Sequence, residues 1–167
     1  MAVRVLPDWI IETGTANGGR ALFLASICEL LDHGQVISID TKVADERAEH
    51  PRITYLEGSP QSDEMSRRVR EIVGESPHVL VVLGSQPGTN LRMEAEFKTY
   101  APLVPVGSYV IVEYTILNGH PVWPGFGPGP GEAVKRILFE NTNWGVDTNL
   151  EKYGLTFNPG GYLKRLR

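Results

Sequence analysis

The chain of 167 residues has a single cysteine, no long apolar run and little basic charge gathered in one place. Cys28 has no second cysteine with which to form an internal disulfide, and its apolar helical surroundings predict a small core residue. No apolar run approaches the ~18 residues that a membrane-spanning helix needs. The formal net charge is −4, and the one basic cluster is at residues 164–167, so we expect neither a nucleic-acid nor a membrane partner.

The beginning of the chain carries no recognisable secretion signal, because the first apolar run starts at Trp9 and is short. A cytoplasmic location is therefore the expectation. The length suits one unit, and we predict a single domain over residues 1–167. The apolar fraction of 41% and the charged fraction of 22% are ordinary for a globular protein and suffice for one core.

Short apolar runs alternate with helical patterns along most of the chain. The predicted strands are 9–13, 35–40, 53–56, 79–83 and 108–114, and the predicted helices between them are 20–31, 62–73 and 91–103. The wholly apolar run at 79–83 is typical of a strand that is covered on both faces. Alternation of this kind favours right-handed crossovers and a parallel sheet. We therefore predict an α/β fold with a Rossmann-like, doubly wound, mostly parallel sheet.

Residues 116–131 are rich in proline and glycine and predict a long loop. Long ordered loops commonly form lids or binding segments, and a disordered linker is the alternative. Beyond this loop, the pattern predicts a helix at 132–139 and strands at 144–147, 152–157 and 162–166.

Acidic residues lie at the ends of the first three predicted strands. Glu12 precedes a turn that contains Gly14 and Gly18, Asp40 ends the second strand, and Glu57 follows the third. Glycines in such a turn allow a ligand to approach the backbone, and ligands of open α/β sheets bind at the carboxyl ends of strands. The glycine spacing matches neither the dinucleotide fingerprint nor the phosphate loop. A carboxylate before the turn suits a positively charged nucleoside such as S-adenosylmethionine, and a solvated role for each acid is the alternative.

Several long strings in the chain resemble the cephalosporin hydroxylase family. That family groups with S-adenosylmethionine-dependent O-methyltransferases, including rhamnosyl O-methyltransferases. The resemblance spans residues 7–166 and is carried by IIETGTANGG, QVISID, HPRITYLEGS, GSYVIVE, GPGPGEAV and LTFNPGGYLKR. It implies the seven-stranded methyltransferase sheet and an S-adenosylmethionine site at Glu12, Gly14, Thr15, Gly18, Asp40 and Glu57. Family members usually carry a further N-terminal segment, so we expect a pocket that is more open here, or one closed by a partner subunit.

The chain departs from the family pattern at the metal site. Where members have Leu-Asp-Ser-Asp-His, residues 83–87 read LGSQP, and where members have Glu-Asp-Thr, residues 113–115 read EYT. Of the carboxylate ligands that the resemblance implies, only Glu113 is kept. Magnesium prefers carboxylate oxygens, and a single one holds it weakly, so we expect no metal. Glu94 or Glu96 as a substitute ligand is the alternative.

A reaction without a metal needs another group to handle the proton of the substrate. His120, in the proline- and glycine-rich loop, is the histidine expected nearest to the active edge, with an ordinary loop role as the alternative. Tyr114 stands where the resemblance places a metal ligand, and its hydroxyl suits a hydrogen bond to the substrate. The predicted catalytic residues are therefore His120, Tyr114 and Glu113.

The sequence thus predicts a divergent, metal-independent O-methyltransferase of natural-product or sugar biosynthesis. Two alternatives stay open. One is a repurposed cyclase, pericyclase or isomerase that acts on an apolar intermediate, since function depends on the site rather than on the fold. The other is a non-catalytic partner subunit. The expected cofactor is S-adenosylmethionine, with a loss of that binding as the alternative, and the expected partners are a small-molecule substrate and further copies of the chain in a homo-oligomer.

Overall fold

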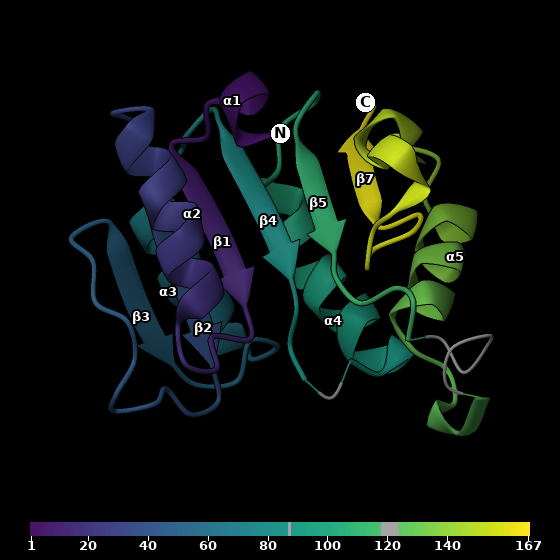
Figure 1. Cartoon of the computed structure of the whole chain (residues 1–167), viewed down its shortest axis with the longest axis horizontal. Helices are drawn as coiled ribbons and strands as arrows, with labels where there is room; N and C mark the ends of the chain where they lie inside the picture. The colour runs from purple at the N-terminus through teal and green to yellow at the C-terminus, as the bar shows by residue number, and fades with distance from the viewer. Residues whose placement is uncertain (87, 118–123) are drawn as a thin grey trace.

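The computed structural model describes residues 1–86, 88–117 and 124–167, which form a seven-stranded sheet with helices on both faces (Figure 1). The strand order is β3-β2-β1-β4-β5-β7-β6. The five parallel strands are β1 (Trp9–Thr13), β2 (Gln35–Asp40), β3 (Ile53–Glu57), β4 (Val79–Leu83) and β5 (Tyr109–Val112). The last two, β7 (Tyr162–Arg165) and β6 (Trp144–Val146), run antiparallel to each other, and β7 is antiparallel to β5. The predicted doubly wound, mostly parallel sheet is confirmed.

The direction of winding reverses between β1 and β4, the two central strands. Trp9 of β1 pairs with Gln35 on one side and with Val79 on the other. The chain therefore winds outward through β2 and β3, returns across the sheet, and continues outward through β4 and β5. In a sheet of this kind, a crevice forms at the carboxyl ends of the strands where the winding reverses. In Figure 1 the arrowheads of β1, β4 and β5 all point to that edge, which is the lower one.

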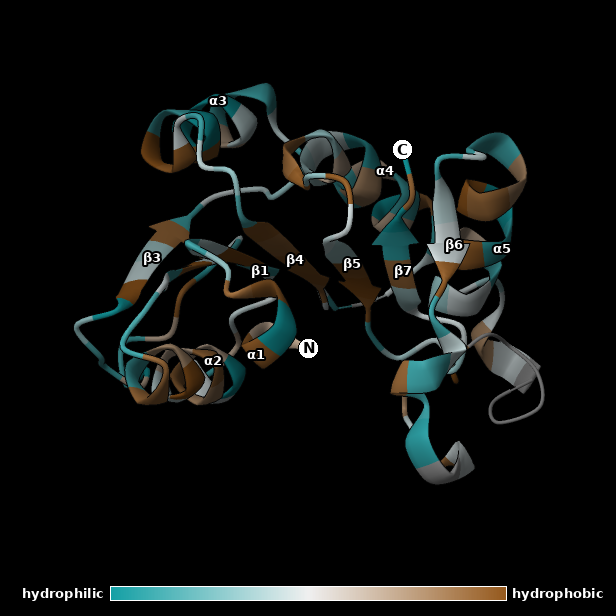
Figure 2. Ribbon diagram, turned by 90° about the horizontal axis from the view of Figure 1, so that it is seen from above, coloured by the Kyte–Doolittle hydropathy of each residue, from teal (hydrophilic) through white to brown (hydrophobic). Residues whose placement is uncertain are grey.

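Helices cover the two faces of the sheet (Figure 2). On one face lie α3 (Asp63–Val73), α4 (Asn90–Tyr100) and α5 (Pro130–Glu140), and on the other lie α2 (Gly19–Leu30) and the short α1 (Ala2–Val5). Turns of 3₁₀ helix occur at Ala101–Leu103, Pro124–Phe126, Thr148–Leu150 and Lys152–Gly154. None of the helices in the described ranges is both long enough and apolar enough to cross a bilayer.

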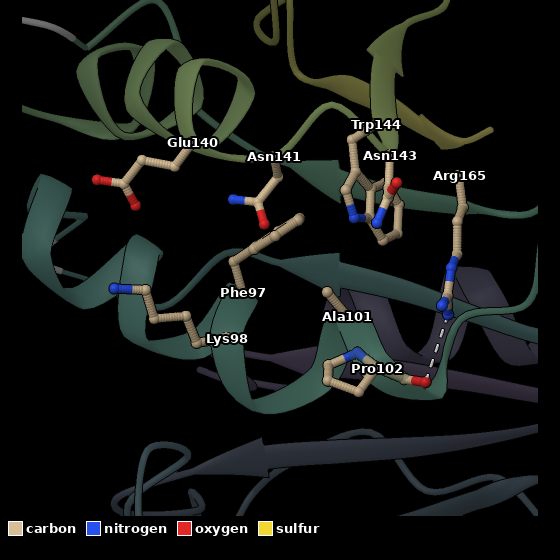
Figure 3. A pocket seen from close by; sticks show the side chains of 9 residues that line it. All are labelled: Phe97, Lys98, Ala101, Pro102, Glu140, Asn141, Asn143, Trp144 and Arg165. Carbon is tan, nitrogen blue, oxygen red and sulfur yellow. Dashed lines mark hydrogen bonds between the residues drawn. The ribbon is translucent and has the colours of Figure 1, made fainter. Parts of the chain in front are cut away.

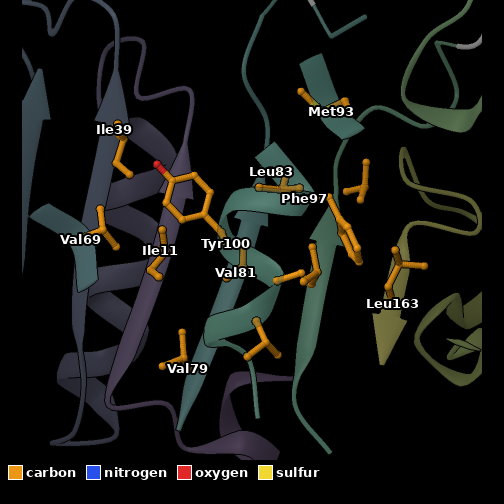
Figure 4. Packing of buried hydrophobic residues seen from close by; sticks show 14 of the residues in the cluster. Ile11, Ile39, Val69, Val79, Val81, Leu83, Met93, Phe97, Tyr100 and Leu163 are labelled. Carbon is orange, nitrogen blue, oxygen red and sulfur yellow. The ribbon is translucent and has the colours of Figure 1, made fainter. Parts of the chain in front are cut away.

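The larger core lies under α3, α4 and α5 (Figure 4). There, Tyr100 of α4 lies among Ile11, Ile39 and Val69, and it is fully buried. Its hydroxyl donates a hydrogen bond to the Pro60 carbonyl at 2.7 Å, so the polar end of this side chain is satisfied within the core. All five residues of β4 are buried, as the uninterrupted apolar run predicted.

The predicted strand at 152–157 is wrong. Residues Lys152–Gly154 form a 3₁₀ turn, and Gly154 has a φ of +64°, which an extended strand does not contain. Leu155 and Phe157 are 86% and 73% exposed, so their alternation with polar residues marks no buried face. The antiparallel partner of β5 is instead the segment that follows the glycine turn, β7.

Several predicted boundaries also shift. Helix α5 begins at Pro130, two residues early, because proline is well suited to the first turn of a helix, where its missing N–H is not needed. The fifth strand ends at Val112 rather than at residue 114, because Tyr114 has a φ of +57°. The short α1 was not predicted.

Gly14, directly after β1, provides a test of how closely β1 and β4 approach at this edge. Its φ is +85°, and a Cβ there would lie 2.5 Å from the Gly84 carbonyl oxygen. We expect Gly14→Ala to lower the free energy of unfolding by at least about 2 kcal/mol, because a left-handed backbone and a steric clash add together. Urea denaturation measures this change.

The matched control for this substitution is Gly19→Ala. Gly19 lies in the first turn of α2, and no heavy atom lies within 4 Å of the position that an alanine methyl group would take there. Alanine is a better helix former than glycine by about 0.5–1 kcal/mol, so this variant should lose no stability. Equal losses in the two variants would contradict the close approach of β1 and β4.

Candidate functional site

A cavity of about 340 Å³ opens at the carboxyl ends of β1 and β4, where the winding of the sheet reverses. Its volume lies at the low end of the range of about 300–1,000 Å³ that is usual for small-molecule sites. The lining comes from the turn between β1 and α2 and from the ends of β2, β4 and β5, and consists of Gly14, Thr15, Ala16, Asn17, Gly19, Arg20, Asp40, Gly84, Gln86 and Tyr114. Four strand ends thus meet at one hollow, as the parallel sheet dictates.

The guanidinium of Arg20 joins three parts of this edge. Its Nε donates to Glu12 Oε1 at 2.5 Å, and its Nη2 donates to the carbonyl oxygens of Thr13 at 2.7 Å and Gly14 at 2.9 Å. Its Nη1 forms an ion pair with Glu113 Oε2. One arginine from the first turn of α2 therefore connects the end of β1 to the end of β5.

Glu12 lies behind this arginine rather than in the wall of the cavity. Its side chain is fully buried, and its second oxygen accepts a hydrogen bond from Ser38 Oγ at 2.5 Å. Burial raises the pKa of Glu12, while Arg20 and the Ser38 hydrogen bond act in the opposite direction. The acid that the resemblance assigns to a cationic cofactor thus already has a cationic partner within the chain.

Asp40 lies in the wall of the cavity, half-buried, at the carboxyl end of β2. Its Oδ2 accepts a hydrogen bond from the Ala16 backbone N–H at 3.1 Å, and its Oδ1 accepts one from the Thr41 N–H at 2.7 Å. Oδ1 also accepts a hydrogen bond from the Thr41 hydroxyl at 3.2 Å. These bonds fix the carboxylate beside the glycine turn, and Oδ2 keeps room for a further donor. Asp40 therefore lies at the edge of the sheet where the sequence predicted it, and its contact with a ligand stays a prediction.

The other predicted cofactor residues divide into two groups. Gly14 and Thr15 line the cavity, and the Thr15 hydroxyl lies 2.8 Å from Ser38 Oγ. Gly18 and Glu57 are not among the lining residues. Gly18 is part of the turn into α2, where its N–H donates to the Thr15 carbonyl at 2.8 Å, and Glu57 is exposed and accepts a hydrogen bond from the Val43 N–H at 3.1 Å.

Of the three predicted catalytic residues, two are described. Tyr114 lines the cavity, is 37% exposed, and has a φ of +57°, which is unusual for a bulky residue and costs of order 1–3 kcal/mol. Its backbone N–H donates to Asn158 Oδ1 at 2.9 Å, so the turn before β7 holds this strained position. Glu113 faces Arg20, and His120 lies outside the described residues.

Sequence reasoning missed the part that Arg20 and Gly84 play together. Gly84 ends the apolar run of β4, and a Cβ on it would lie 2.7 Å from Arg20 Cζ and 2.6 Å from Glu113 Oε2. The contact between Arg20 and Glu113 therefore lies directly next to Gly84, which has no side chain. The signals available in the sequence were an arginine directly after the glycine turn and a glycine at a position where the family resemblance places an acid.

The described residues do not fit a magnesium ion. Across residues 1–86, 88–117 and 124–167, no group of three or more His, Cys, Asp or Glu side chains is placed to hold a metal. Glu113 is paired with a guanidinium, which repels a divalent cation. The two alternative ligands have other neighbours: Glu94 lies 3.5 Å from Arg136 Nε, and Glu96 is bonded to Thr13.

A second hollow, of about 420 Å³, lies away from this edge (Figure 3). It is formed by the end of α4, the segment between α5 and β6, and Arg165 of β7. Phe97 and Trp144 meet edge to face in its floor, with ring centroids 5.2 Å apart. It contains none of the predicted site residues and lies apart from the carboxyl ends of β1 and β4.

Glu96 is a buried acid directly beneath the site. It is fully buried on α4, and its Oε2 accepts a hydrogen bond from the Thr13 hydroxyl at 2.7 Å. Burial raises the pKa of Glu96, and the hydrogen bond from Thr13 only partly opposes this effect. The folded chain therefore keeps this proton at pH values where the unfolded chain has lost it.

This raised pKa predicts the direction of a pH dependence. The stability that Glu96 contributes is complete below the ordinary pKa of glutamate and is lost as the pH rises through the raised value. Glu12 acts in the same direction. In wild type, the free energy of unfolding should fall as the pH rises from about 5 to about 8. In Glu96→Gln this fall should be less steep, by up to about 1.4 kcal/mol per pH unit. Urea denaturation across this pH range measures the slope in both proteins. The exposed Glu75→Gln is the control, and an identical slope in wild type and Glu96→Gln would contradict the assignment.

Comparison with solved structures shows the fold. CmcI, solved with Mg and SAM, matches with a TM-score of 0.70 at 20% identity, covering 100% of this chain and 68% of CmcI. The O-methyltransferase NovP matches with a TM-score of 0.63 at 16% identity, covering 99% of this chain and 75% of NovP. The mycinamycin-pathway methyltransferase MycE, in complex with Mg, SAH and mycinamycin VI, matches with a TM-score of 0.58 at 20% identity; the match covers 80% of this chain and 37% of MycE. The sheet is that of the methyltransferase fold.

Comparison of sequences shows the family. The rhamnosyl O-methyltransferase of Mycobacterium bovis is 35% identical over 166 residues, which cover 95% of this chain and 67% of the relative. The rhamnosyl O-methyltransferase of Mycobacterium leprae is 33% identical over 170 residues, which cover 98% of this chain and 73% of the relative. The model of the family described as rhamnosyl O-methyltransferase/CmcI matches residues 1–166. The chain therefore belongs to the rhamnosyl O-methyltransferase/CmcI family of methyltransferase-type enzymes.

Proposed function

We propose that the cavity at the carboxyl ends of β1 and β4 binds S-adenosylmethionine, and that the enzyme methylates an oxygen of a small molecule without a divalent metal. The observation that carries this proposal is the convergence of the Gly14 turn and Asp40 on one cavity at the point where the winding of the sheet reverses. The relatives add support, since CmcI was solved with SAM and MycE with SAH.

The nucleoside end of the cofactor fits the residues present. Gly14 and Thr15 of the turn line the cavity, and the Asp40 carboxylate can accept hydrogen bonds from ribose hydroxyls. The methionine end meets a different environment from the one that the sequence predicted. There, Arg20 faces the cavity in front of Glu12, so an anionic group of the ligand has a partner at this end.

When bound, S-adenosylmethionine supplies an electrophilic methyl group on a sulfonium. Gly14, Thr15 and Asp40 would hold this cofactor, and the substrate hydroxyl would need a base to take its proton when the methyl group is transferred to its oxygen with the carbon–sulfur electron pair left on sulfur. Tyr114 lines the cavity, which supports a hydrogen bond from its hydroxyl to the substrate, and the assignment of the base to His120 stays a prediction.

Metal independence is the part of the proposal in which this chain differs from its relatives. CmcI and MycE were solved with Mg. In this chain the donor set is different, because Glu113 is paired with Arg20 and Gly84 provides no ligand. A role in natural-product or sugar biosynthesis, self-association and a cytoplasmic location stay predictions.

Isothermal titration with S-adenosylmethionine and S-adenosylhomocysteine, in Mg²⁺ and in EDTA, tests the proposal. We expect both ligands to bind with the same affinity in the two buffers. Asp40→Ala should weaken binding at least tenfold, about 1.4 kcal/mol, because the ribose hydroxyls lose their acceptor. The control is Asp45→Ala, an exposed acid in the loop after β2, which should bind as wild type does.

Two outcomes would contradict this proposal. An absence of binding at millimolar ligand would exclude the cofactor and turn attention to the cyclase, isomerase and partner-subunit alternatives, which no observation favours at present. Binding or methyl transfer that requires Mg²⁺ would keep the methyltransferase but contradict its metal independence.

A further inference from the structure

The ion pair between Arg20 and Glu113 lies at the carboxyl ends of the central strands, beside the cavity. Glu113 extends from the end of β5, and Glu12 lies at the end of β1. The two carboxylates come from strands on opposite sides of β4, and the guanidinium lies between them over Gly84. Two anionic groups that share one cation form the same arrangement that carboxylates form around a metal ion.

The guanidinium of Arg20 occupies the space next to position 84, which has no side chain. A Cβ there would lie 2.7 Å from Arg20 Cζ and 2.6 Å from Glu113 Oε2, closer than packed atoms approach. A side chain at position 84 would therefore displace the ends of Arg20 and Glu113 from the positions that they hold here.

Hydrogen bonds hold the guanidinium of Arg20 in place and leave part of its donor capacity for a ligand. Four of its five N–H groups have acceptors among the described residues: Glu12, Glu113 and the carbonyls of Thr13 and Gly14. The side chain is 21% exposed and lines the cavity, so one N–H is left for a ligand. A guanidinium keeps its charge at every physiological pH, and unlike a bound ion it cannot dissociate.

We propose that Arg20 is a built-in cation that takes the place of a divalent metal ion in this enzyme. It is a positioning residue: it neutralises Glu12 and Glu113, excludes divalent ions from Glu113, and offers its remaining N–H to an oxygen in the cavity. This inference rests on the proposed function, because it concerns the same site. Its test needs neither cofactor nor substrate, so the two proposals can fail separately.

The test is a titration with Mn²⁺, whose electron paramagnetic resonance signal reports the free ion. In wild type and in Glu113→Gln, we expect the same weak binding, because Glu113 is not available to the ion. Arg20→Ala frees both carboxylates and should bind Mn²⁺ at least tenfold more tightly than wild type. Adding Glu113→Gln to Arg20→Ala should remove this gain. Arg67→Ala, which removes an exposed arginine of α3, is the control for the change in net charge and should bind as wild type does.

Removal of Arg20 leaves Glu12 buried without its cation, and that variant is liable to misfold. The variant Glu12→Gln/Arg20→Ala avoids the buried charge and is compared with Glu12→Gln alone in the same titration. Nuclear magnetic resonance of wild type adds a second measurement. We expect slow solvent exchange at the Arg20 Nε–H, and a shift of this signal in Glu113→Gln.

Three results of these measurements would overturn this inference, and a fourth would come from an activity assay. The first is Mn²⁺ binding by wild type that is lost in Glu113→Gln. The second is an absence of any gain when Arg20 is removed from a folded variant. The third is fast solvent exchange of the Arg20 Nε–H. A methyltransferase that requires Mg²⁺ would also exclude a built-in cation while leaving methyl transfer intact, whereas a chain without methyl transfer could still show all the expected Mn²⁺ results.

Discussion

The arrangement of the site depends on one guanidinium held between two carboxylates. Glu12 is fully buried, and a buried carboxylate without a partner is strongly destabilising. Arg20 supplies that partner and, with its remaining donors, fixes the two carbonyls of the turn after β1. The same group reaches Glu113 across the sheet. The guanidinium therefore connects the ends of β1 and β5 next to Gly84, which has no side chain.

The cavity itself results from the sheet. Five parallel strands end at one edge, and the reversal of winding between β1 and β4 prevents the following loops from filling the space between them. The end of β5 is held by the turn before β7: Asn158 accepts from the Tyr114 N–H, and the Gly161 carbonyl accepts from the Val112 N–H at 2.8 Å. Residues at 112–114 and 158–161, far apart in the sequence, thus form one supporting structure.

This chain shows how a family can keep a fold while its site changes. The turn after β1 and Asp40 meet at one cavity, and both follow from short local patterns. Gly84 and Tyr114, which line the same cavity, stand where the family resemblance places metal ligands. The proposed loss of the metal concerns these two positions and not the residues proposed to hold a nucleoside.

Much of the fold was predictable from the sequence. The five parallel strands, their helices and the alignment of Glu12, Asp40 and Glu113 near one edge all depend on local periodicity and on the rule that parallel strands end together. The strand predicted at 152–157 was wrong because alternation in the sequence does not show whether a neighbouring strand is available for pairing. The early start of α5 depends on a proline that also suits a loop.

The sequence by itself therefore determined the family, the sheet and the acids at its edge, because each of these depends on patterns within about ten neighbouring residues. Only the tertiary structure decided what those acids contact. Arg20, Gly84 and Glu113 are distant along the chain, and their common position arises from the pairing of β1 with β4 and of β4 with β5. Whether a carboxylate faces a ligand, a metal or a guanidinium depends on distances of a few ångströms between such strands, and no local pattern encodes them.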